Sequence, residues 1–198
     1  ITLDFRSLFG SKDLSSSKDV ILYRKYDAAQ GVTHCVASYS NVSESRSVGP
    51  NLSLIKSFVC VDGKDWQTSS VENSKDFSLA NLIKTRDSRF EASFYHKPTV
   101  KSKSCYLYPV KFIPRSALKY LEVKGGAPDV EYTSVNNLNG YPVLRYAEVL
   151  LNWIEAKAEL STLGAGSVTQ ADIDLSVNKI RNRPLAQEAV ERGVQKTA

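Results

Sequence analysis

Apolar residues between Tyr141 and Leu160 recur with the period of an amphipathic helix. The residues expected on the apolar face are Leu144, Ala147, Leu151, Ile154, Ala158 and Leu160. Pro142 suits the first helical turn, where its missing amide hydrogen would have no partner in any case. Gly164 and Gly166 supply the stop. This pattern predicts a long helix over 141–160 whose apolar face packs on a partner helix.

A partner helix is predicted directly after these glycines. Thr169 and Asp172 have the spacing of a capping box, in which two side chains satisfy the free amides of a helix start. Apolar residues then follow at helical spacing, at Ile173, Val177 and Ile180. Pro184 ends the segment. Small residues on the first helix would let the two helices approach closely, so we expect an antiparallel, tetratricopeptide-like helical hairpin.

The remaining three quarters of the chain carry shorter and more irregular patterns. Strands are expected at 19–26, Thr33–Tyr39, Phe90–Tyr95 and Ser104–Phe112, and helices around Leu54–Phe58 and at Asp76–Thr85. Loops are expected at Asn41–Pro50 and 123–140, with a tight turn at Asp62-Gly63. The predicted fold is therefore mainly α, with the hairpin of 141–198 packed on a loop-rich region over 1–140 that contains short β-hairpins. Together these regions are expected to form one domain.

Several motifs carry a resemblance to a known family. The run YPVLRYAEVLLNWIEAKAEL, followed by Asn178 to Arg183, resembles the SusD/RagB family of surface glycan-binding lipoproteins. Upstream pieces agree in order, namely 20–26, 50–58 with Asp62-Gly63, and Arg86-Asp87-Ser88-Arg89-Phe90. The family usually has proline where this chain has Ser88. The matches extend over about residues 19 to 183, and we expect the chain to be the C-terminal portion of a larger protein.

The resemblance implies a function without catalysis. The complete protein would sit on a SusC-like TonB-dependent transporter at the cell surface, held to the outer membrane by a lipid anchor outside this chain, and would deliver oligosaccharides to that transporter. Some family members capture peptides instead, so a peptide ligand is the first alternative. A helical-repeat module that docks a protein partner is the second. By the same resemblance, Arg86, Asp87 and Arg89 belong to the scaffold.

Exposed aromatic rings on loops are the residues to seek for a glycan, because sugar rings present flat faces of C–H groups that stack on aromatic rings. Trp66 is the first candidate, since it follows the Asp62-Gly63 turn and has no periodic core partner. Tyr95, Tyr106 and Tyr108 flank a basic loop and are the further candidates. The alternative for each is packing in the core or across strands. Trp153, on the long helix, is expected to pack.

Composition excludes several other classes of protein. The 198 residues are 42% hydrophobic and 24% charged, as in an ordinary globular domain. A net charge of +5 could favour nucleic acid, but the basic residues are scattered among 21 acidic ones. The densest basic patch, at Lys97, Lys101 and Lys103, lies in a predicted loop. We therefore expect no nucleic-acid partner, and no apolar run approaches the length of a membrane span.

Catalytic, metal and cofactor motifs are also missing from the sequence. The cysteines Cys35, Cys60 and Cys105 are odd in number and have no C-x-x-C spacing, which argues against zinc and a full disulfide framework. His34 adjoins Cys35, but neighbours on a strand point to opposite faces, which disfavours a catalytic dyad. His96 could reach Cys105 across a hairpin, although nothing singles that pair out. We expect neither an enzyme nor a cofactor.

Overall fold

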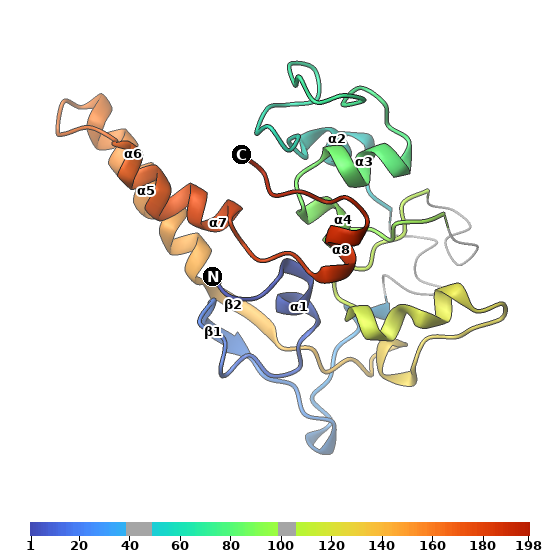
Figure 1. The fold of residues 1–198 in the computed structure, drawn as a ribbon. Helices are drawn as coiled ribbons and strands as arrows, with labels where there is room; N and C mark the ends of the chain where they lie inside the picture. The colour runs from blue at the N-terminus through green and yellow to red at the C-terminus, as the bar shows by residue number, and fades with distance from the viewer. Residues whose placement is uncertain (39–48, 99–105) are drawn as a thin grey trace.

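The computed structural model describes residues 1–38, 49–98 and 106–198, and in these ranges the fold is mainly α (Figure 1). The α-helices are α1 (Phe5–Gly10), α2 (Leu52–Ser57), α3 (Leu79–Thr85), α4 (Arg89–Ser93), α5 (Tyr146–Thr162), α6 (Gln170–Ile173), α7 (Lys179–Arg181) and α8 (Gln187–Glu191). Between α6 and α7 lies a π-helix, η6 (Asp174–Asn178). The 3₁₀ helices are η1 (Ala28–Gln30), η4 (Arg115–Glu122) and η5 (Val130–Tyr132). Strands β1 (Val20–Arg24) and β2 (Tyr141–Arg145) form one antiparallel pair.

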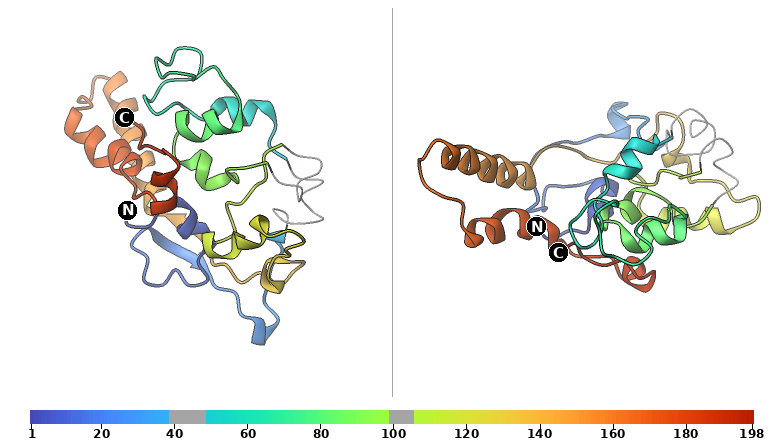
Figure 2. Two further views of the ribbon diagram at one scale, coloured as in Figure 1. Left: turned by 45° about the vertical axis from the view of Figure 1, so that its right-hand side comes forward. Right: turned by 90° about the horizontal axis from the view of Figure 1, so that it is seen from above.

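The predicted helical hairpin is present. Figures 1 and 2 show α5 running antiparallel to the α6–η6–α7 segment, and the pair projects from the rest of the molecule as an arm. Thr169 and Asp172 form the expected capping box. Asp172 also binds α5, with its Oδ1 2.5 Å from Lys157 Nζ. At the other end of the turn α5 stops as predicted, since Gly164 takes a φ of +76° that favours glycine.

The long helix begins at Tyr146, and the prediction that it begins at Pro142 is wrong. Tyr141 to Arg145 instead pair with β1, and the Tyr146 amide donates to the carbonyl of Asp19 at 2.9 Å, so strand pairing continues up to the helix. Proline is tolerated in this two-stranded sheet because an outer edge needs no amide donor. Pro142, a residue type that is common in the first turn of a helix, thus lies in a strand.

The apolar face predicted for this helix is only partly covered. Ala147 is buried, and Ile154 is half-buried. Leu151 and Leu160 remain 46% and 50% exposed, and Trp153, expected to pack, is 40% exposed. One partner helix covers one side of α5, so the arm keeps apolar side chains on its surface.

Three predicted strands are wrong in the described residues. Residues 33–38 form only the isolated bridge of His34 with Asn137, and the 90–95 and 106–112 segments share only the bridge of Phe94 with Pro109. Residues 89–93 form α4 because Phe90 and Phe94, four residues apart, both turn into the core. The expected loop at Asn41–Pro50 lies mostly outside the described residues. The expected helix at Asp76–Thr85 begins at Leu79.

Buried apolar residues gather in three clusters. One lies under α2, α3, α4 and α8, with Phe90 at its centre, and a second surrounds Tyr108 and Ile113 beside η4. A third, smaller cluster surrounds Leu8 at α1. Polar side chains connect the segments between these clusters.

The Arg86-Asp87-Ser88-Arg89 motif is one such connection. Arg86 is fully buried and donates to the Ser74 carbonyl at 2.8 Å and to Thr85 Oγ1 at 2.9 Å. Asp87 accepts from Arg89 Nε at 2.5 Å and from Thr197 Oγ1 at 2.6 Å. These bonds link α3 and α4 to the end of the chain, in agreement with a scaffold role.

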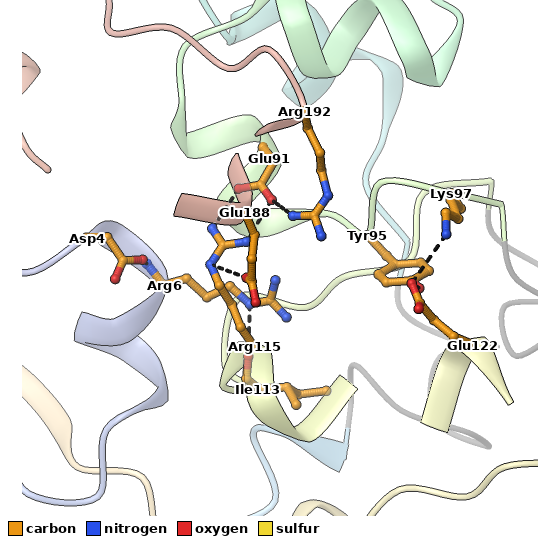
Figure 3. Close-up of polar contacts among 10 residues, drawn as sticks. All are labelled: Asp4, Arg6, Glu91, Tyr95, Lys97, Ile113, Arg115, Glu122, Glu188 and Arg192. Carbon is orange, nitrogen blue, oxygen red and sulfur yellow. Dashed lines mark hydrogen bonds and ion pairs between the residues drawn. The ribbon is translucent and has the colours of Figure 1, made fainter. Parts of the chain in front are cut away.

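A second polar connection surrounds the carboxylate of Glu91, which is 2% exposed. Arg115 binds both of its oxygens at 2.7 Å, and Arg192 Nη1 binds Oε1 at 2.8 Å. Arg6 lies beside them and donates from Nε to the Ile113 carbonyl at 2.9 Å (Figure 3). We call Arg6, Glu91, Arg115 and Arg192 the Glu91 cluster. It joins α1, α4, η4 and α8.

We predict that Ser88→Pro stabilises the protein by about 0.5 to 1 kcal/mol. Ser88 has a φ of −55°, which proline adopts, and none of the hydrogen bonds among the described residues uses its amide as donor. Ser78→Pro is the matched control: its φ of −62° also suits proline, but its amide donates to Asp76 Oδ1 at 2.7 Å. Urea denaturation should show a gain for the first variant only. Equal effects of the two variants would contradict this account.

The contribution of Glu91 to the stability of the fold depends on pH. Burial alone would raise the pKa of its carboxyl, but hydrogen bonds from Arg115 and the charges of Arg115, Arg6 and Arg192 outweigh burial and hold that pKa below its usual 4.5. A carboxyl with a lowered folded-state pKa stabilises the fold above its unfolded-state pKa, and this contribution is lost as the pH falls through the folded-state pKa.

Glu91→Gln should therefore lower the free energy of unfolding by about 3 kcal/mol at neutral pH, because it leaves buried guanidinium groups without a counter-charge. The deficit should shrink as the pH is lowered from 4.5, the ordinary pKa of the carboxyl. Denaturation curves recorded over this pH range measure the deficit. Glu155→Gln, exposed on α5, is the control and should change stability little at any pH. A deficit independent of pH would refute the electrostatic explanation.

Candidate ligand-binding site

The loop that carries Trp66 is held by a dense set of hydrogen bonds. Gly63 takes a φ of +75°, and the Cys60 amide donates to the Lys64 carbonyl at 2.7 Å across the turn. The Asp62 carboxylate accepts from Ser69 Oγ and from the Ser70 amide, each at 3.0 Å. The desolvation of Asp62 is outweighed by these bonds, which lower the pKa of its carboxyl. The loop is therefore built around an ionised Asp62.

Trp66 lies half-buried on this loop. Its ring packs edge to face with that of Phe77, with centroids 5.2 Å apart, and Lys56 Nζ lies 5.3 Å from the Trp66 centroid. These contacts orient the ring and leave part of it in solvent. Trp66 is thus a supported aromatic surface with a cation beside it.

Tyr106 is the most exposed of the four candidate aromatics, at 59%. Its hydroxyl accepts from the Leu79 amide at 3.1 Å, at the start of α3. Ser78, at the N-cap of that helix, makes no side-chain capping bond, so Tyr106 supplies the missing acceptor. Phe77 and Leu79 therefore connect Trp66 and Tyr106 to the same short segment.

Tyr95 and Tyr108 have a different environment, since they are 5% and 1% exposed. The Tyr95 amide donates to the Tyr108 carbonyl at 2.8 Å, and both rings belong to the cluster around Ile113. The Tyr95 hydroxyl donates to Glu122 at 3.1 Å, and burial together with Glu122 raises the pKa of Tyr95 to about 12. In this structure the two rings pack in the core and present little surface for stacking.

A cavity of about 230 Å³ lies where the Tyr95 segment meets the Glu91 cluster. Arg6, Arg115 and Arg192 contribute to its lining, together with His96 and Lys119. Sequence reasoning missed this cavity, because its residues come from four segments with no spacing in common. The arginines come together around Glu91 only in the folded chain.

A larger cleft, of about 340 Å³, is lined by residues of the arm and by Phe5 and Asp87 to Arg89. Its arginines have structural partners: Arg183 donates to Asp19 Oδ2 and to the Leu3 carbonyl, each at 2.7 Å, and Arg89 binds Asp87. The guanidinium carbon of Arg145 lies 5.5 Å from the centroid of the Phe9 ring. This cleft is therefore part of the scaffold that attaches the arm.

The described residues contain no candidate metal centre. No group of three His, Cys, Asp or Glu side chains that could hold a metal occurs among them. The His34 ring pairs with the Asn139 carbonyl at 2.9 Å and accepts from the Val36 amide, while Cys35 and Cys60 are free. The other pair considered, His96 with Cys105, cannot be placed because Cys105 lies outside the described residues. In the described ranges, no helix is long and apolar enough to cross a bilayer.

Comparison with known proteins agrees with the motifs found in the sequence. Residues 18–192 match the model of the SusD family, SusD_RagB. No curated protein and no solved structure matches. The family is one of binding proteins without catalytic activity, and membership implies binding of nutrients or glycans at the cell surface. Because the match covers most of the chain, this protein belongs to the SusD family.

Proposed function

We propose that this protein binds an oligosaccharide without catalysis and delivers it to a SusC-like TonB-dependent transporter. In this proposal it is exposed at the outer membrane and held there by a lipid anchor outside the present chain. Family membership supports the general role. The observation that carries the glycan part is the Trp66 ring, partly exposed on a loop whose conformation is held by Asp62.

The chemistry around Trp66 suits a sugar. An aromatic ring stacks on the C–H face of a pyranose, and polar groups nearby can bind its hydroxyls. Lys56, Asp65 and Gln67 are exposed around the ring and supply such groups. Tyr106 offers a second exposed ring near the same segment. We therefore assign the primary glycan contact to Trp66 and Tyr106, and regard Tyr95 and Tyr108 as support for neighbouring structure.

We predict that Trp66→Ala weakens oligosaccharide binding about tenfold, because stacking on one aromatic ring contributes about 1 to 1.5 kcal/mol. Titration calorimetry of the full-length protein with a panel of neutral oligosaccharides measures the change. Trp153→Ala is the control, since Trp153 also presents its ring to solvent but lies on the arm. Unchanged affinity in the Trp66 variant would show that the glycan site lies elsewhere. Binding of a peptide pool, but no glycan, would favour the peptide alternative.

Exposed apolar side chains on the arm favour a second candidate function, contact with a protein partner. Val149 and Leu160 of α5 are 42% and 50% exposed and lie on one side of the helix, about three turns apart, and in helical repeats such faces pack on further helices. We propose the transporter as the partner that this face contacts. In this proposal the arm is tetratricopeptide-like.

Val149→Ser together with Leu160→Ser should reduce co-purification of the transporter at least tenfold and leave oligosaccharide affinity unchanged, because both residues lie on the arm and not on the Trp66 loop. Glu155→Gln with Glu159→Gln, on the same helix, is the control pair and should change neither measurement. Normal transporter capture by the variant of Val149 and Leu160 would exclude this face of the arm from the contact.

A further inference from the structure

The cavity beside the Glu91 cluster contains more positive charge than the scaffold uses. Its cations are Arg6, Arg115, Arg192 and Lys119. Among the anions, Glu91 has both oxygens occupied by arginines, and Glu188 reaches Arg115 Nε only at 3.6 Å. Glu122 pairs with Lys97, outside the lining, at 3.3 Å. An added anion would therefore complete the charge balance of the cavity.

Arg6 lines this cavity and has an incomplete set of hydrogen bonds. Its side chain is 3% exposed and extends from α1 in the direction of Tyr95 (Figure 3). Nε donates to the Ile113 carbonyl, but Nη2 is buried and has no hydrogen-bond partner among the described residues. The nearest acid in sequence, Asp4, accepts from the backbone amide of Arg6. A buried guanidinium nitrogen without an acceptor is uncommon, and it marks a position where an acceptor would bind.

Electrostatics agrees with this geometry. Burial, followed by the charge of Arg115, lowers the pKa of Arg6 to about 9, so Arg6 is still positively charged at neutral pH. Burial, with Arg192 and Lys97, lowers the pKa of His96 to about 4, so its imidazole is neutral there. The cavity thus combines a fixed positive charge with a neutral imidazole that can hydrogen-bond a hydroxyl group.

We infer that this cavity binds the carboxylate of an acidic sugar, such as a uronic acid unit at one end of an oligosaccharide. The carboxylate would accept from Arg6, with Lys119 at the exposed side of the cavity and with His96 and Ser116 available to the ring hydroxyls. A guanidinium group pairs well with a carboxylate, which is the anionic group of uronic acids. The volume of about 230 Å³ suits a single sugar ring. This inference rests on the proposed function and adds the class of glycan.

A test compares matched acidic and neutral ligands on the full-length protein. Trimers of galacturonate and of glucuronate, and the methyl esters of both trimers, are titrated by calorimetry. At least one acidic trimer should bind ten or more times as tightly as its ester, and added salt should reduce the difference, because the preference is electrostatic.

Two variants test which residues produce the preference for the acidic trimer. Arg6→Gln should lower the affinity for the acidic trimer at least tenfold and leave the affinity for the ester unchanged. Because Arg6 is buried, the thermal unfolding of this variant must be recorded as well. Lys119→Gln, at an exposed position of the lining, should weaken acidic binding about threefold without disturbing the fold. Lys124→Gln is the matched control, equally exposed and outside the cavity, and should have no effect.

The possible failures are distinguishable. Equal binding of acid and ester would overturn this inference and leave the proposed glycan function intact. Binding of neither trimer nor of neutral oligosaccharides would overturn both. An acidic preference that survives both the Arg6 and the Lys119 changes would place the carboxylate elsewhere and overturn the assignment. Arg6-dependent binding of an acidic peptide in place of the trimers would overturn it in favour of a peptide.

Discussion

The ion pairing of Glu91 is the interaction on which the arrangement of this molecule most depends. One buried carboxylate is bound by guanidinium groups from η4 and from the end of α8, and Arg6 of α1 lies against the same group. The bond between Glu91 and Arg192 alone joins residues 101 positions apart in the sequence. A charge buried in this way is costly unless it is paired, so the segments must come together or the carboxylate must return to water.

This constraint also shapes the cavity that we propose for a carboxylate. The arginines that neutralise Glu91 form one wall of a cavity, and the surplus charge of Arg6 gives that cavity its chemical character. Trp66 lies on a loop that is held by the Asp62 hydrogen bonds, and the Tyr106 hydroxyl accepts from the amide at the start of α3. A glycan-binding member of the SusD family would then have an aromatic contact for sugar faces and a charged contact for an acidic unit.

Local patterns predicted much of the helical structure, and the reason is that their partners lie close in sequence. The glycine stop after α5, the capping box at Thr169 and the pairing of the two arm helices all involve neighbours within a short stretch. The strand at 20–24 was also predicted, but its partner, more than a hundred residues away, was assigned to a helix. Phe90 and Phe94 illustrate the opposite error, since aromatic residues suggested a strand where their four-residue spacing produced a helix.

The sequence by itself determined the family, the helical arm and the turn that presents Trp66, because each depends on residue types at fixed local spacing. Only the tertiary structure decided that Tyr95 and Tyr108 are buried while Tyr106 is exposed, since burial depends on what other segments cover. It also decided that arginines from three segments converge on Glu91 and that one nitrogen of Arg6 is left without an acceptor. Such charge convergence arises from contacts between distant parts of the chain, and no local pattern encodes it.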